Sequence, residues 1–141
     1  MKNTMLMFAY GMNTNQQEMA ARCPTAASLG HARLIDYQFR FATHADVIKC
    51  KDSYVDGVLW EINCDNLQAL DVLEGYPYYY TRRLRRVAYQ NRVVMAETYY
   101  MLPGNLPALP TSSYFKLVEH GYQQHGIATD QIHNAQADLT Y

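Results

Sequence analysis

An apolar strand and a tight turn are encoded in Met7-Phe8-Ala9-Tyr10-Gly11-Met12-Asn13, where an apolar run that begins at Met5 stops abruptly. Such a run predicts a buried strand, and the Gly-x-Asn that ends it predicts a tight turn. Glycine tolerates backbone angles that other residues avoid and lets a ligand approach the main chain closely. Successive free N–H groups in such a turn form a concave donor site for an anion or a carbonyl oxygen. Taken alone, the same residues also fit an ordinary turn at the end of a strand.

The second informative segment is a predicted helix that ends at Glu74-Gly75. Leu67, Leu70 and Leu73 recur at helical spacing, and glycine is the usual residue just past a helix. Glu74 therefore lies in the last turn, beside apolar neighbours and at the end of the helix dipole that disfavours an anion. Both surroundings raise the pKa of a carboxyl group, as a general base at neutral pH requires. A solvated glutamate at a helix end is the alternative.

The remaining pattern predicts about six strands and two or three helices in one domain, without repeats or linkers. After the first strand, further strands are expected at Ala27–Ala42, Val47–Cys50 and Val55–Ile62, and a hairpin at Tyr80–Tyr89 and Arg92–Met101 turns at Gln90-Asn91. A helix is expected from about Ser112 to His125, after a proline-rich loop at 102–110.

Composition predicts a single globular domain. The chain has 141 residues, of which 49% are apolar and 18% charged, and its net charge is −1. We expect a core over about residues 5–127 and a polar, helical tail over 128–141. Because the charge is nearly balanced, neither nucleic acid nor an acidic membrane is expected as a partner. The run Met5 to Tyr10 is too short for a secretory core, so a cytoplasmic protein is expected.

No metal site or cofactor is expected. Cys23, Cys50 and Cys64 are odd in number and far apart, which fits neither a disulfide framework nor a Cys-x-x-Cys metal pair. Glu119-His120 lacks the His-Glu-x-x-His order of a zinc protease helix. The chain also has no phosphate-binding Gly-x-x-x-x-Gly-Lys loop and no dinucleotide fingerprint.

The first strand of the predicted hairpin carries four arginines. Neighbours on a strand point to opposite faces, so Arg83 and Arg85 share one face and Arg82 and Arg86 the other. Arginines can form a site for a carboxylate or phosphate, but they also protect a solvated edge strand from aggregation. We favour the edge strand.

Taken together, four segments resemble the gamma-glutamylcyclotransferase-like family, which includes the AIG2-like proteins. Its mark is a Tyr-Gly-Ser-Asn loop, then a Gly-Val-Leu/Val-Tyr/Trp strand, then a helix that ends in a catalytic glutamate. The matching segments here, in the same order, are Tyr10-Gly11-Met12-Asn13, Gly57-Val58-Leu59-Trp60, Leu70–Gly75 and, opening the last long helix, Pro110-Thr111-Ser112-Ser113-Tyr114. Met12 departs from the pattern, because the family usually has serine there; this puts the substrate in doubt more than the reaction.

The resemblance implies an α+β domain with a mixed, barrel-like sheet and surrounding helices. It also implies an enzyme that releases 5-oxoproline and a free amine from a γ-glutamyl amide, by attack of the substrate's own amine and without a cofactor. Glu74 would be the general base and acid. The substrate would be bound by the loop residues Tyr10, Gly11, Met12 and Asn13 and by the hydroxyl of Tyr114.

One alternative is a non-catalytic protein on the same fold that binds a small anion or another metabolite. Met12 and the arginine-rich strand favour this binder, whereas a glutamate at the expected position favours the enzyme. The sequence does not choose the amine moiety of the substrate, and it leaves open whether two copies pair as a homodimer.

Overall fold

The computed structural model describes residues 3–140, and in this range five strands are accompanied by four α-helices and one short 3-10 helix, η1. None of the helices in residues 3–140 is long and apolar enough to cross a membrane. The strands are β1 Thr4–Ala9, β2 Ala27–Ala42, β3 His44–Asn63, β4 Tyr80–Tyr89 and β5 Arg92–Met101. The helices are η1 Met12–Thr14, α1 Gln16–Arg22, α2 Cys64–Glu74, α3 Ser112–Gln124 and α4 Asp130–Ala137.

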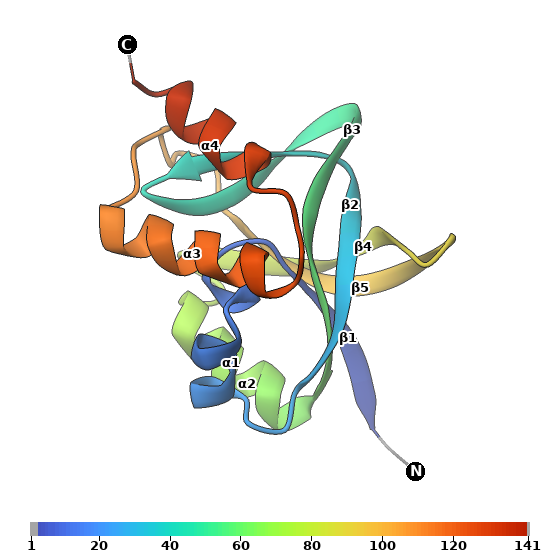
Figure 1. The fold of residues 1–141 in the computed structure, drawn as a ribbon. Coiled ribbons are helices and arrows are strands. Elements are labelled where there is room, and N and C mark those ends of the chain that lie inside the picture. The colour runs from blue at the N-terminus through green and yellow to red at the C-terminus, as the bar shows by residue number, and fades with distance from the viewer. Residues whose placement is uncertain (1–2, 141) are drawn as a thin grey trace.

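The strands close into a barrel in the order β1-β3-β2-β4-β5. β5 returns to β1 in a parallel pair, with Met7 opposite Glu97, whereas the other neighbours are antiparallel. The expected mixed, barrel-like sheet of an α+β domain is therefore confirmed. In Figure 1 the helices lie on one side of the barrel, and the β4–β5 hairpin projects on the other.

The long strand β3 corrects the prediction of two strands at 47–50 and 55–62. The chain continues as one strand from His44 to Asn63. Its pairing with β2 shifts register between the pairs Ile35–Tyr54 and Tyr37–Lys49, where residues 50–53 of β3 lie opposite Asp36 alone, so the irregularity is a bulge within β3. Asp36 and Asp52 face each other at this bulge with φ angles of 64° and 65°. The Asp52 N–H donates to Asp36 Oδ1 at 3.0 Å, so the polar segment that resembled a turn is tied into the ladder.

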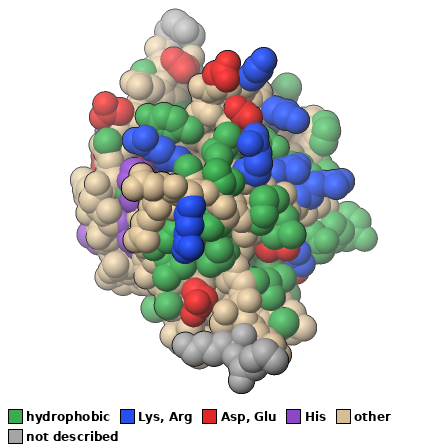
Figure 2. Space-filling view, turned by 90° about the vertical axis from the view of Figure 1, so that its right-hand side faces the viewer, with side chains coloured by type: hydrophobic (Ala, Val, Ile, Leu, Met, Phe, Trp, Pro, Cys, Tyr) green, Lys and Arg blue, Asp and Glu red, His purple; other side chains and the backbone are tan. Residues whose placement is uncertain are grey.

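The β4–β5 hairpin has the predicted bounds and turns at Gln90 and Asn91, which both have positive φ angles. Its exposed apolar side chains include Leu84, Val93 and Met95. Figure 2, which views the molecule from the side toward which the hairpin projects, shows apolar side chains interspersed with lysines and arginines.

The core extends further along the chain than the expected boundary near residue 127. Helix α4 forms in the predicted polar tail, but its Ile132 is fully buried and Ala135 is nearly so. Both side chains belong to the same apolar cluster as Phe8 and Leu34 of the barrel. The tail is thus an amphipathic helix packed on the domain.

Candidate functional site

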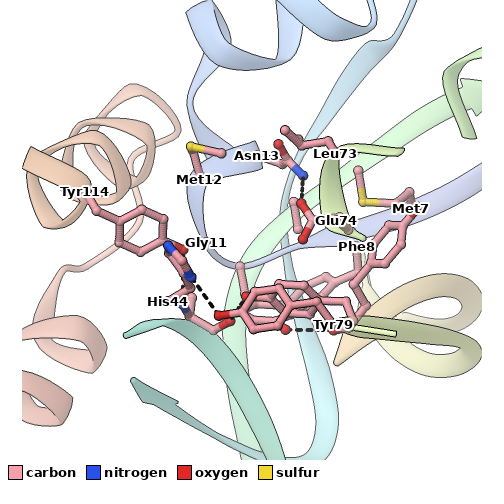
Figure 3. Close-up of a pocket in the computed structure, with 15 residues that line it drawn as sticks. Met7, Phe8, Gly11, Met12, Asn13, His44, Leu73, Glu74, Tyr79 and Tyr114 are labelled. Carbon is pink, nitrogen blue, oxygen red and sulfur yellow. Dashed lines mark hydrogen bonds between the residues drawn. The ribbon is translucent and has the colours of Figure 1, made fainter. Parts of the chain in front are cut away.

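One pocket brings together all of the site residues that the sequence predicts. It lies where the end of β1, the turn η1, the start of β3, the end of α2 and the first turn of α3 meet (Figure 3). The predicted residues on its wall are Tyr10, Gly11, Met12, Asn13, Glu74 and Tyr114. They come from three segments that are far apart in sequence, so the barrel and its helices assemble the pocket.

The loop after β1 forms a compact turn closed by main-chain hydrogen bonds. The N–H of Thr14 donates to the carbonyl of Gly11 at 3.1 Å, and that of Asn15 to the carbonyl of Met12 at 3.0 Å. These bonds occupy the later N–H groups of the turn. The earlier N–H groups, at the pocket wall, are the candidate donors for an anion or a carbonyl oxygen.

Gly11 is required by close packing. Its φ angle of −117° does not lie in the left-handed region, so the first reason offered for this glycine, an unusual backbone, does not apply. A Cβ atom here would lie 2.8 Å from Cβ of Ala45 and 3.2 Å from the hydroxyl oxygen of Tyr114. The missing side chain lets the loop, β3 and α3 meet at the pocket.

Glu74 is the last residue of α2, which ends at Gly75 in the left-handed conformation, as predicted. Its side chain is half-buried, and Oε1 accepts a hydrogen bond of 3.1 Å from Nδ2 of Asn13. Burial raises the pKa of Glu74 to about 7, although the bond from Asn13 and the charge of Arg22 oppose the rise. A carboxyl group with this pKa can both take up and release a proton near neutral pH.

The hydroxyl of Tyr114 is placed to donate a hydrogen bond to a ligand in the pocket. It lies in the first turn of α3, where its N–H is capped by the side chain of Thr111. Its hydroxyl oxygen accepts a bond of 3.0 Å from the N–H of Ala45, so its own proton is available for a ligand. Burial raises the pKa of Tyr114 well above its usual value, which keeps the hydroxyl protonated.

His44 and Tyr79 are wall residues that the sequence did not reveal. His44 Nδ1 lies 2.7 Å from the Tyr79 hydroxyl, and its ring packs edge-on against Tyr114 (Figure 3). Burial lowers the pKa of His44, so the imidazole is neutral at pH 7. No motif marks His44, but the tyrosine cluster directly after Gly75 was a signal for Tyr79, since tyrosine suits half-polar pockets.

The arginines of β4 fit neither sequence interpretation. β4 pairs with β2 as well as β5, so it is not an edge strand, and no Lys or Arg is among the residues that line the pocket within residues 3–140. Arg82 instead binds Asp71 on α2, and Arg86 binds Asp36. The pocket is therefore a polar and aromatic site with a single carboxyl group.

The described residues offer no evident metal ligands. No group of three or more His, Cys, Asp or Glu side chains that could hold a metal ion occurs in residues 3–140.

Comparison with known proteins identifies relatives. A family model described as "Gamma-glutamyl cyclotransferase, AIG2-like" matches residues 7–120. A protein of Homo sapiens named gamma-glutamylcyclotransferase is 26% identical in an alignment of 140 positions, which covers 89% of this chain and 74% of the relative. The Mus musculus protein of the same name is 25% identical over 138 residues, covering 88% and 73%.

Solved structures agree in fold. One named gamma-glutamyl cyclotransferase superposes with a TM-score of 0.84 at 27% identity, covering 98% of this chain and 92% of its own. YkqA from Bacillus subtilis superposes with a TM-score of 0.83 at 21% identity, over 98% of this chain and 56% of its own.

Proposed function

This chain belongs to the gamma-glutamyl cyclotransferase, AIG2-like family, and from that premise we propose that it cleaves a γ-glutamyl amide by internal cyclisation, as a single catalytic domain. The products are 5-oxoproline and a free amine. The observation that carries the proposal is Glu74, a carboxyl group with a pKa of about 7 that is hydrogen-bonded to Asn13 at the edge of the donor loop. In this proposal, a base and the main-chain donors of the loop act on one substrate in one pocket.

The reaction needs a base because the attacking group of the substrate is its α-amine, which is an ammonium at neutral pH. Ionised Glu74 takes one proton from it, and the free nitrogen attacks the γ-carbonyl carbon. A bond forms from this nitrogen to the carbon, and the bond to the amide nitrogen breaks. Glu74 returns this proton to the departing nitrogen. The attacking nitrogen loses its second proton as the ring amide forms, and the released amine takes up one proton to become an ammonium, so no net proton is gained or lost.

The loop would stabilise the negative charge that develops on the γ-carbonyl oxygen. Main-chain N–H groups fixed in advance act as an oxyanion hole, where one donor is typically worth about 10²- to 10³-fold in rate. The hydroxyl of Tyr114, which lies beside Gly11 of the loop, supplies a further donor. The pocket also holds the glutamyl chain folded back on itself, which converts a flexible molecule into a near-attack conformer.

The pocket favours the enzyme over the non-catalytic binder of small anions. A site built for an anion alone commonly uses Arg or Lys. Among residues 3–140 the wall has neither, and it includes the carboxyl group of Glu74. That carboxyl group would repel an anion but would attract the α-ammonium of a γ-glutamyl compound.

The proposal is tested by incubating the purified protein with a panel of γ-glutamyl amides and γ-glutamyl dipeptides and measuring 5-oxoproline by mass spectrometry. We expect release from at least one compound and loss of most of it in Glu74→Gln, because general base catalysis is typically worth about 10²- to 10⁴-fold. No release from any compound between pH 5 and 9, together with tight binding of another metabolite, would establish the binder instead.

A further inference from the structure

The last turn of α2, which carries Glu74, has little apolar burial to hold it in place. Leu70 is fully buried one turn earlier, but Val72 is 83% exposed and Leu73 is 39% exposed. A helix end with so few buried contacts opens readily. Catalysis by a carboxyl group nevertheless needs it to be held within a fraction of an ångström.

A polar network at the start of this turn supplies the missing constraint. Asp71 lies one helical turn before Glu74, and its two carboxylate oxygens accept bonds of 2.8 and 2.9 Å from Nε and Nη2 of Arg82. The hydroxyl of Tyr99 donates to the same carboxylate at 2.6 Å. Arg82 also approaches Glu97 on β5 at 3.3 Å, so the network joins α2 to two barrel strands.

Arg82 contacts the chain on both sides of Glu74. Before it, the guanidinium binds Asp71; after it, the same guanidinium lies over the ring of Tyr76, 4.6 Å from the centroid. Although burial acts in the other direction, the bonds from Arg82 and Tyr99 lower the pKa of Asp71, so this carboxylate stays ionised at neutral pH. The forked arginine geometry fixes orientation as well as distance.

We propose that Arg82, acting through Asp71, is a positioning residue that holds the end of α2 so that Glu74 stays against Asn13 at the pocket wall. Tyr99 links this network to the pocket, because it is one of the wall residues and its hydroxyl binds Asp71. The catalytic part of this inference rests on the proposed function, whereas the positioning of α2 does not.

The positioning is tested by hydrogen–deuterium exchange of the full chain, with Arg82→Ala compared with Arg86→Ala. Arg86 is the matched control, because it lies on the same strand and pairs with Asp36 at 2.9 Å, away from α2. Exchange of peptides that span residues 71–76 should accelerate roughly tenfold or more in Arg82→Ala while the core strands stay protected, and should not change in Arg86→Ala. Unchanged exchange in a folded Arg82→Ala protein would overturn the inference.

The catalytic part is tested by a double-mutant cycle on 5-oxoproline release. Arg82→Ala should lower kcat about tenfold or more with little change in KM, whereas the same substitution in a Glu74→Gln background should cost almost nothing, since no base remains to be positioned. If Arg82→Ala lowers kcat by the same factor in wild type and in Glu74→Gln, Arg82 does not act by positioning Glu74. Arg82→Lys keeps the charge but loses the forked geometry of the guanidinium, so its kcat should lie between those of wild type and Arg82→Ala. If Arg82→Ala does not fold, Arg82→Lys replaces it in both experiments. If wild type releases no 5-oxoproline, the proposed function fails, and the exchange comparison still decides the positioning.

Discussion

The rate of cyclisation should fall at acidic pH with the pKa of Glu74. Burial raises this pKa from 4.5 to about 7, so the ionised base form of Glu74, and with it the rate, is lost as pH falls through 7. About half of the free enzyme then carries ionised Glu74 at pH 7 and about one tenth at pH 6, and kcat/KM should drop about tenfold for each further pH unit. A glutamate with an ordinary pKa would keep nearly full activity at pH 6.

The assay is 5-oxoproline release at low substrate concentration between pH 5 and 9, in buffers of constant ionic strength. At low substrate concentration the profile reports the free enzyme, in which this pKa applies. In the proposed mechanism the substrate binds as the ammonium, whose titration on the alkaline side limits the rate at high pH and not at low pH. His44 is the other group in the pocket that titrates in this range, and burial lowers its pKa from 6.5.

Two variants separate these groups. Glu74→Gln should lose both the rate and the acid limb, because the amide is nearly isosteric and takes up no proton. His44→Gln should keep an acid limb near pH 7 whatever its overall rate. The reasoning is refuted if the acid limb disappears in His44→Gln, or if Glu74→Gln turns over within a factor of about three of wild type.

Three further outcomes are expected. Gly11→Val should abolish 5-oxoproline release, because even its Cβ would lie 2.8 Å from that of Ala45; an active variant would show that the loop is not the oxyanion site. Met12→Ser should release 5-oxoproline at a rate within about tenfold of wild type but change the ranking of γ-glutamyl compounds in a competition assay. The substitution shortens a side chain of the pocket wall and leaves the main chain of the loop unchanged. An unchanged ranking would show that Met12 does not determine specificity. Glu74→Gln should raise the melting temperature at pH 8 but not at pH 4. The folded state favours neutral Glu74, which adds up to about 3 kcal/mol to the free energy of unfolding below pH 4.5, and this contribution is lost as pH rises through 7. If variant and wild type have equal melting temperatures at both pH values, the raised pKa is contradicted.

The elements that the sequence predicted correctly carry their signals locally. The turn at Gln90-Asn91 marks the hairpin of β4 and β5, and leucines at helical spacing followed by Gly75 mark α2. The continuity of β3 could not be predicted in this way, because it depends on how its bulge at residues 50–53 pairs with β2 and on the bond between Asp36 and Asp52. Such a bulge is a property of a strand pair and not of either segment alone.

The same distinction applies to the pocket. Glu74 and the loop at Gly11 were found because each ends a regular element, and Tyr114 was found through the family resemblance. His44 lacks any local signal, since it reaches the wall only when β3 joins the barrel. The role of Arg82 was also hidden, because strand alternation assigns it a face but cannot identify Asp71 as its partner.

The loop and Glu74 are held by different means, and this difference has consequences for catalysis. The loop is fixed by buried contacts: the carbonyl of Tyr10 accepts from the Tyr122 hydroxyl at 2.6 Å, and the Tyr10 hydroxyl donates to the carbonyl of Tyr99 at 2.7 Å. Asn15 adds a bond of 3.1 Å to the carbonyl of Leu117 on α3. The donors of an oxyanion hole act best when fixed in advance, and these contacts form without a ligand.

Glu74, in contrast, depends on one hydrogen bond from Asn13 and on the ion pair one turn earlier. An ion pair of this kind is weaker than a buried core when it is partly solvated, and salt screens it further. Damage to the contacts of α3 should therefore disturb the whole loop and the fold, whereas damage to the pair of Arg82 and Asp71 should act on turnover first. For the same reason, high salt should lower kcat before it lowers the melting temperature.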